Sequence, residues 1–194
     1  RIERKLFITF VFMAKKEKYL YINNIQNLDL DYIKKSNAFL IIKNNNINKN
    51  EVFNKFIRKC KNMNINIYIS NDVKLLFKLK LRHFYISAFN KSNYHHIKKI
   101  NPKITIIGSA HNLKEIIEKK NQGCEKIILS RLFKTYKKGS HGIIKFNLIT
   151  NQSKNDYIAL GGITQKNHKK TNLINIKGYA LSSELKFKPR FLID

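Results

Sequence analysis

Short runs of β-branched and aromatic residues alternate, from Lys18 onward, with longer stretches of helical spacing. Strands that alternate with helices are typical of βα units, which build a parallel sheet. Eight runs have the length and composition of buried strands: Tyr19–Asn23, Ala38–Lys43, Ile65–Ser70, His83–Ser87, Ile104–Gly108, Lys126–Leu129, Tyr157–Leu160 and Ile176–Leu181. Eight units predict an α/β fold, a single compact (β/α)8 TIM barrel, although such barrels usually need about 250 residues. A doubly wound open sheet is the alternative.

Two of the intervening segments have clear amphipathic spacing. The apolar residues of the segment Glu51–Met63, which include Val52, fall on one face of a helix. The apolar residues of the segment Asn112–Gln122, which include Ile117, also fall on one face. Gly142–Thr150 suits a helix as well as a strand. The count of eight strands assumes that this segment is a helix.

The start of the chain looks like an extension rather than part of the fold. The first residue is Arg, and Met13 opens a polar lead into the first strand, so we expect a leader over residues 1–12 and one barrel domain over 13–194. No apolar run approaches the roughly 20 residues of a membrane span. Cys60 and Cys124 are far apart and form no Cys-x-x-Cys pair, which argues against a disulfide framework or a zinc knuckle and favours a reducing, cytoplasmic setting.

Net charge is the most unusual feature of the composition. Lys and Arg number 39 against 12 Asp and Glu, giving +27, which by itself favours a nucleic-acid binder. Yet the chain has 33 Lys, 25 Asn and 30 Ile, all encoded by A/T-rich codons, and its six Arg are scattered. We therefore attribute most of the charge to codon bias and expect no nucleic-acid partner.

An RNA- or polyanion-binding barrel stays open as an alternative of another class. Lysines in a ring around the carboxyl ends of the strands would favour a small anionic ligand, and a stripe along one side would favour nucleic acid. Tyr68, Phe84 and Tyr85 lie at strand positions, where we expect core residues rather than stacking platforms for bases.

Two glycines and two serines follow the last two predicted strands. Gly161 and Gly162 end the run Tyr157–Thr164, and Ser182 and Ser183 end the next strand. In (β/α)8 barrels these strand ends commonly form a phosphate site, where backbone amides face the anion. A tight strand-to-helix turn explains the glycines equally well.

Two further strand ends carry candidate chemistry. Ser109 and His111 follow strand five, where they could position a phosphate and transfer a proton, unless His111 simply begins the next helix. The loop after strand six carries Thr135, Lys137 and Lys138, which suit a diphosphate. We regard Glu115 as a helix-surface charge.

Taken in order, these pieces resemble the thiamine-phosphate synthase family, which includes the TenI-type thiazole tautomerases. The family's Gly-Ser-x-His turn is similar to Gly108-Ser-Ala-His111, and its Phe-Pro-Thr-x-Thr-Lys loop is similar to Phe133-Lys-Thr-Tyr-Lys-Lys138. Its Ile-Gly-Gly-Ile turn with a later Asn is similar to Leu160-Gly-Gly-Ile163 with Asn167, and its Gly-Val-Ala-Val-Ile-Ser ending is similar to Gly178-Tyr-Ala-Leu-Ser-Ser183.

The resemblance implies a barrel that joins hydroxymethylpyrimidine diphosphate to thiazole phosphate and releases diphosphate with the help of Mg²⁺. Diphosphate departure needs cations on the leaving group more than it needs a base. If the family's residue roles apply to the matching positions, the diphosphate or thiazole groups face Lys138, Thr135 and Ser109. The thiazole phosphate is then bound by Gly162 and Ser183.

The front half of the chain departs from the family pattern. The family has Gln-x-Arg-x-Lys on strand two, and here only Lys43 retains a positive charge. The family's Asn-Asp pair after strand three is retained as Asn71-Asp72. Asn90 stands where the second metal-binding Asp is expected. The resemblance thus implies Asp72 and Asn90 as Mg²⁺ ligands, and Lys43, Asn71 and Lys138 on the diphosphate.

Three outcomes remain open at this point. A diverged synthase would use His111, Lys138 and Ser109 in catalysis, and Asn71, Asp72 and Lys138 fit it, whereas a tautomerase fits the losses in the front half better. We rank the synthase first because the thiazole-phosphate half of the site is common to both. A tautomerase-like relative would use His111 for proton transfer on a thiazole phosphate and would need no metal. A phosphate binder without turnover is the third. All three predict small anionic partners and no membrane, and all are compatible with a homo-oligomer.

Overall fold

The computed structural model describes residues 15–26, 28–43, 51–136, 139–153, 155–182 and 189–193. The expected leader and Met13 lie outside these ranges, as do Lys137, Lys138 and Ser183.

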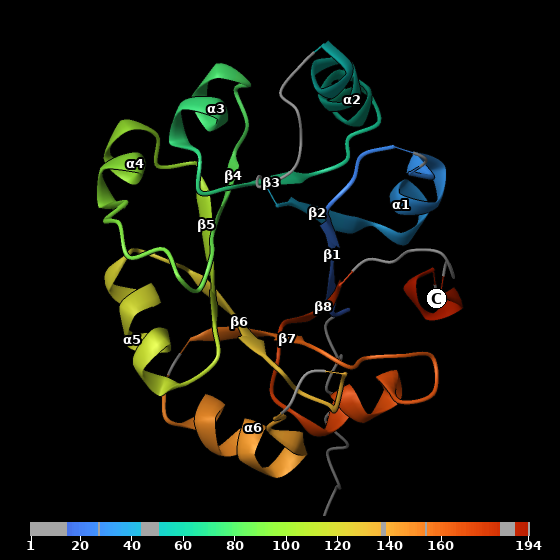
Figure 1. Ribbon diagram of the computed structural model, residues 1–194, viewed down its shortest axis with the longest axis vertical. Helices are drawn as coiled ribbons and strands as arrows, with labels where there is room; N and C mark the ends of the chain where they lie inside the picture. Colours follow the sequence, from blue (N-terminus) through green and yellow to red (C-terminus); the bar gives the residue numbers. More distant parts are fainter. Residues whose placement is uncertain are drawn as a thin grey trace, which may run out of the picture.

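Eight parallel strands close into a barrel in sequence order, with the helices outside (Figure 1). The strands are β1 (Glu17–Ile22), β2 (Ala38–Ile42), β3 (Ile67–Ser70), β4 (His83–Ile86), β5 (Thr105–Ala110), β6 (Lys126–Ser130), β7 (Asp156–Leu160) and β8 (Gly178–Ser182). β1 pairs with both β2 and β8, for example through Leu20 with Leu40 and with Leu181. This closure confirms the (β/α)8 prediction and excludes the open sheet.

Helices follow the first six strands. They are α1 (Leu30–Ser36), α2 (Glu51–Asn62), α3 (Val73–Lys78), α4 (His95–Ile100), α5 (Leu113–Asn121) and α6 (Gly142–Asn151). The ambiguous segment is therefore helix α6, as the eight-unit count assumed. A 3-10 helix, η2 (His168–Leu173), follows β7, and another, η4 (Arg190–Leu192), lies near the end of the chain. None of the helices in the described ranges is long and apolar enough to span a membrane.

β5 is longer at its carboxyl end than the sequence predicted. Gly108 seemed to end the strand, but it lies inside it, where a Cβ would come within 2.6 Å of Cys124 Sγ and 2.8 Å of Lys119 Cδ. Glycine is required here because helix α5 packs closely on the strand. Ser109 is consequently a strand residue and not part of a turn.

Tyrosines fill the lumen of the barrel. Tyr19, Tyr21, Tyr68 and Tyr85 belong to the inner apolar cluster, because alternate residues of a strand face the same side. Phe84 packs between strands and helices. Tyr68, Phe84 and Tyr85 are at most 3% exposed, which confirms that they are core residues and removes them as stacking platforms.

The helices bury narrower apolar faces than the sequence indicated. In α2, Phe53 and Ile57 are buried, but Val52 is 56% exposed, and in α5 Ile117 is 58% exposed. A short helix on a barrel touches the strands along one stripe, so residues at the margin of its apolar face stay in solvent. The prediction that these residues share a buried face was wrong at Val52 and Ile117.

Candidate active site

The carboxyl ends of the strands bring most of the predicted site residues to one rim of the barrel. Asn71 follows β3, Asn90 lies in the loop after β4, His111 follows β5, and Gly161 follows β7. In a parallel barrel these loops all surround the same opening. Residues from distant parts of the sequence therefore meet here.

The floor of this opening is polar. The Tyr21 hydroxyl donates to the Tyr85 hydroxyl over 3.2 Å, and Tyr85 is also hydrogen bonded to Ser109. The Lys43 ammonium lies 4.7 Å from the centre of the Tyr21 ring. Burial raises the pKa of Tyr85, so this hydroxyl stays neutral. Tyr21 and Tyr85 thus link Lys43 at the end of β2 with Ser109 in β5.

Asn71 and Asn90 form a structural cluster at the rim. Asn71 has a left-handed backbone (φ 56°), and its side-chain oxygen accepts from Ser87 N at 3.0 Å and from Asn90 Nδ2 at 3.1 Å. Asn90 Nδ2 also donates to the Tyr94 hydroxyl at 2.7 Å, and Asn90 Oδ1 accepts from Ser92 N at 2.8 Å. Both amides hold the β3 and β4 loops in place.

The donor set here does not fit a Mg²⁺ site. One oxygen of Asp72 caps α3 by accepting from Leu75 N at 2.8 Å, and the oxygen of Asn90 is already an acceptor for Ser92. Within the described ranges, no group of three or more His, Cys, Asp and Glu side chains is placed to hold a metal ion. Mg²⁺ prefers several oxygen ligands, usually carboxylates. We therefore derive no step from a metal at this rim.

His111 is held by a carboxylate that the sequence analysis treated as a surface charge. Glu115 Oε2 accepts from His111 Nδ1 at 2.8 Å and from the backbone N–H of His111 at 2.8 Å. The other oxygen, Oε1, accepts from Asn112 Nδ2 at 2.9 Å, while Asn112 Oδ1 caps Glu115 N. The sequence does contain a pattern that predicts this contact. Asn112-x-x-Glu115 is a capping-box pattern, and His111 lies four residues before Glu115.

The protonation of this pair follows from its hydrogen bonds. Burial acts against the charged form of Glu115, but the hydrogen bonds from the His111 side chain and backbone outweigh it and lower the pKa of Glu115. A carboxylate only accepts hydrogen bonds, so Nδ1 of His111 carries a proton. In the neutral imidazole Nε2 then keeps its lone pair and is a base.

A pH-dependent contribution to stability is expected from Glu115. Because the folded protein lowers its pKa, the carboxylate stabilises the fold above the ordinary value of 4.5, and this stabilisation is lost as the pH falls through the lowered pKa. We expect Glu115→Gln to cost about 0.5–2 kcal/mol at about pH 7 and much less at about pH 3. Urea unfolding at the two pH values measures the difference, and an equal cost at both would contradict this account.

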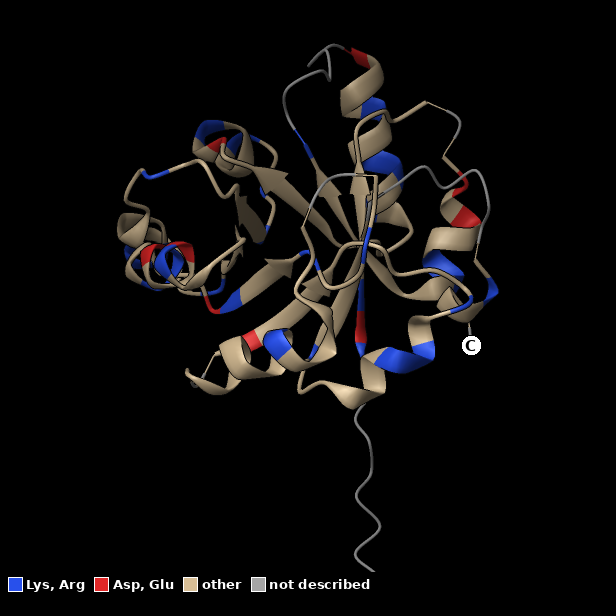
Figure 2. Ribbon diagram, turned by 60° about the horizontal axis from the view of Figure 1, so that its bottom comes forward, with Lys and Arg blue, Asp and Glu red and all other residues tan. Residues whose placement is uncertain are grey.

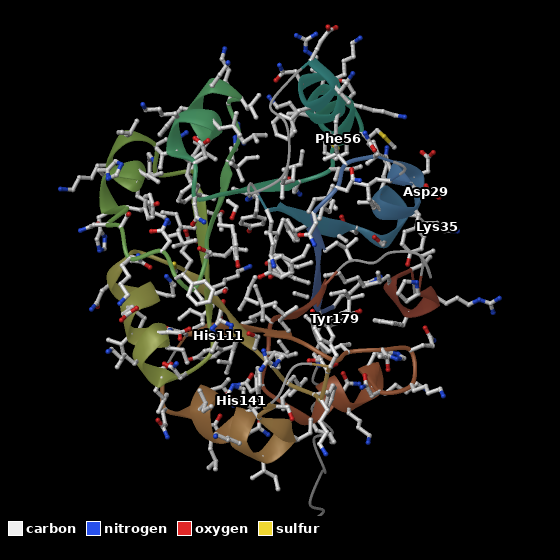
Figure 3. All side chains as sticks on the ribbon, in the orientation of Figure 1. Asp29, Lys35, Phe56, His111, His141 and Tyr179 are labelled. Atoms are coloured by element: carbon white, nitrogen blue, oxygen red, sulfur yellow. The ribbon has the colours of Figure 1, made fainter. Side chains whose placement is uncertain are left out.

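His141 is a second histidine beside His111, and no motif in the sequence pointed to it. Its Nε2 lies 3.1 Å from the Ser130 carbonyl, and its ring is also hydrogen bonded to the backbone of His111. Figure 3 shows the two histidines close together at the rim, on the side of α5 and α6. Burial lowers the pKa of His141 despite these bonds. His141 thereby joins the ends of β5 and β6.

The glycine turn after β7 packs against the loop after β6. Gly161 has φ +105° and Gly162 has φ +68°, and a Cβ on Gly162 would lie 2.6 Å from the Lys134 carbonyl oxygen. Asn167 fastens the turn, since Nδ2 donates to the Gly162 carbonyl and Oδ1 accepts from Thr164 N, each at 2.8 Å. The glycines are thus explained by close chain packing, and their predicted role toward a phosphate stays a prediction.

Two of the remaining predicted residues belong to elements at the same opening. Thr135 is partly buried in the loop after β6, and Ser182 is the last residue of β8. Lys138 and Ser183 lie outside the described residues.

Lysines are spread over the outside of the barrel. Every helix from α1 to α6 carries at least one, and Figure 2 shows the blue segments on elements all around the fold. Among the residues that the structure describes, they form neither a stripe along one side nor a closed ring at the carboxyl ends. This distribution supports codon bias as the origin of most of the charge.

The sequence profile of the thiamine monophosphate synthase family (TMP-TENI) matches residues 31–185. The chain belongs to this family. The match spans β2 to β8 and includes Asn71, Asn90, His111 and Gly161 of the rim. The family as a whole binds small phosphorylated substrates. No curated protein sequence matches the chain at a significant level.

Solved structures of low sequence identity share the fold. A thiamine phosphate pyrophosphorylase from Pyrococcus furiosus superposes with a TM-score of 0.71 at 14% identity, covering 91% of this chain and 93% of that one. Another from Bacteroides thetaiotaomicron gives 0.61 at 15%, covering 92% of each chain. A 4-hydroxy-2-oxoglutarate aldolase from TTHB1 gives 0.66 at 7%, covering 91% and 90%. At these identities the likeness concerns the barrel alone.

Proposed function

We propose that the protein binds a thiazole phosphate at the carboxyl-end rim and transfers a proton on its ring, as a tautomerase does. The observation that carries this proposal is the His111–Glu115 pair, in which the 2.8 Å bond from Nδ1 leaves Nε2 as the basic nitrogen. The family membership supplies the class of substrate. Neither the diphosphate nor a metal is needed for this reaction.

The proton transfer follows from these residues. Nε2 of neutral His111 removes a proton from one ring atom of the bound tautomer, and the electron pair moves into the ring. Glu115 stabilises the imidazolium that forms, because its carboxylate already accepts the Nδ1 proton. The double bond at the other end of the conjugated system opens at the same time, and His111 returns the proton to the carbon that receives this electron pair. No proton is gained or lost overall, and no leaving group departs.

An exposed aromatic ring suits a flat heterocycle at this place. Phe89, in the loop after β4, is 88% exposed, and its ring centre lies 6.2 Å from that of His111. Single exposed apolar side chains are common on protein surfaces, so it is the position of Phe89 beside His111, rather than its exposure, that indicates a ligand contact. A thiazole ring stacked on Phe89 would present its edge to His111.

Phe89→Ala tests this placement. We expect KM for thiazole phosphate to rise about 5- to 10-fold, corresponding to the loss of one aromatic contact, with a smaller change in kcat. Phe89→Tyr keeps the ring and is the matched control. An unchanged KM in Phe89→Ala would exclude the stacking contact.

Coupling of thiazole phosphate to a pyrimidine diphosphate is the second candidate, and the family match favours it. The rim departs from what this reaction needs, because Asp72 caps a helix and Asn90 replaces a carboxylate. Coupling would place the departing diphosphate near Lys43 and Lys138.

One experiment separates the two candidates. The full chain is incubated with a thiazole phosphate tautomer alone, and then with thiazole phosphate and pyrimidine diphosphate, with and without Mg²⁺. We expect tautomer conversion without metal and no thiamine phosphate. Mg²⁺-dependent thiamine phosphate that is lost in Lys138→Ala would establish the synthase instead.

A further inference from the structure

A cavity of about 760 Å³ lies at the end of the barrel opposite the candidate active site. Its walls include the first residues of three strands, Glu17 of β1, Lys126 of β6 and Asp156 of β7, together with η2 and η4. A five-residue strand is about 16 Å long, so a small ligand in this cavity cannot reach the carboxyl-end rim. The volume is in the range of small-molecule sites, about 300–1,000 Å³.

The lining carries a clear excess of positive charge. Its two acidic residues are Glu17 and Asp156. Its lysines are Lys15, Lys16, Lys18, Lys126, Lys169 and Lys177. This excess gathers at one concave place, in contrast to the spread of lysines over the helices.

The two carboxylates are already engaged with cations or hydroxyls. Glu17 forms an ion pair with Lys126 and accepts from the Tyr19 hydroxyl at 2.7 Å, and Asp156 lies 3.9 Å from the Lys177 ammonium. Neither acid therefore neutralises the other lysines of the cavity.

Two of those other lysines lack a charged partner. Lys16 donates to the Thr171 carbonyl at 2.6 Å and to Asn172 Oδ1 at 2.9 Å, which are both neutral. Lys169 has no hydrogen-bond or ion-pair partner among the residues that the structure describes. Burial lowers the pKa of Lys16, a cost that a bound anion would offset. The ammonium groups of Lys16 and Lys169 can therefore bind an anion that is not part of the chain.

The remaining walls are apolar and aromatic. Ile174, Tyr179 and Phe191 line the cavity, and the His168 ring stacks on Phe191 with centres 4.4 Å apart and planes 16° apart. An inorganic ion alone would leave these walls in contact with water. An organic molecule with a phosphate group would use both kinds of surface.

We propose that the amino-end cavity is a second binding site, separate from the catalytic rim, for a small phosphorylated organic molecule. The phosphate lies among Lys16, Lys169 and Lys177, and the organic part lies against Tyr179 and Phe191. Lys177 can take part because its contact with Asp156 is long, at 3.9 Å, and exposed to solvent, so the pair is weak. This site does not depend on the tautomerase proposal, since it shares no residue with the rim.

The test uses the ¹⁵N-labelled full chain titrated with inorganic phosphate at constant ionic strength. We expect saturable shifts of the amide signals of Lys169, Thr171 and Lys177. The double variant Lys169→Gln/Lys177→Gln, whose side chains are exposed, should lower the affinity at these signals at least about fivefold. Signals of His111 and Gly162 report the rim separately, so loss of one site is distinguishable from loss of the other.

The matched control is Lys74→Gln/Lys99→Gln, which removes the same charge from exposed positions on α3 and α4. This control should leave the affinity at the amino end within about twofold. Chloride that reproduces the shifts at equal ionic strength, an equal loss in both double variants, or the absence of a saturable shift would each overturn the proposal.

Discussion

His111→Gln should lower the rate of thiazole phosphate tautomer conversion about 10²- to 10⁴-fold, with little change in KM. Glutamine keeps a donor for Glu115 but has no basic nitrogen, so the variant removes the proton acceptor and preserves the contact at the start of α5. Glu115→Gln should cause a smaller loss, because it leaves the base in place but removes the charge that stabilises the imidazolium.

The control for this variant is His96→Gln, an exposed histidine on α4. It should retain full activity. Thermal unfolding should show that His111→Gln is as stable as the parent protein to within about 1 kcal/mol. A folded His111→Gln protein with unchanged kcat would remove His111 from the chemistry.

Gly162→Ala should destabilise the protein by about 2–4 kcal/mol. Two costs combine at this position. The backbone has φ +68°, which L residues rarely adopt, and the added Cβ would lie 2.6 Å from the Lys134 carbonyl oxygen and 2.8 Å from Phe133 Cβ. Both obstacles belong to the β6 loop, so the turn can accept a side chain only if this loop moves.

Gly142→Ala separates the two costs. Gly142 has nearly the same φ, +66°, but a Cβ there would meet nothing within 4 Å. It should therefore cost only about 1–2 kcal/mol, the price of the left-handed conformation. Urea unfolding of both variants measures the difference, and equal losses would mean that the contact with Lys134 is not what requires glycine at 162.

The strand pattern alone predicted the barrel, because each strand is a β-branched or aromatic run between helical segments, and closure needed only eight of them. The boundaries failed where a glycine had a packing role: Gly108 seemed to end β5, but it makes room for Lys119 and Cys124. Such a role depends on how closely the following helix, α5, packs back onto the strand, and the strand pattern alone does not reveal this distance.

The candidate site was predictable to a similar degree. The positions of Ser109, His111 and Asn71 at strand ends follow from the barrel. Their partners do not, because Asn71 binds a loop two elements away and Asp72 turns to cap its own helix. Glu115 could have been assigned from the capping-box spacing, whereas His141 reaches His111 only through the path of the β6 loop.

The most direct test of the central claim is deuterium uptake by thiazole phosphate in D₂O, followed by proton NMR with the parent protein and no metal added. We expect protein-dependent exchange of a ring proton that is lost in His111→Gln and kept in His96→Gln. If thiazole phosphate binds to the parent protein and no ring proton exchanges, proton transfer by His111 at this rim is contradicted.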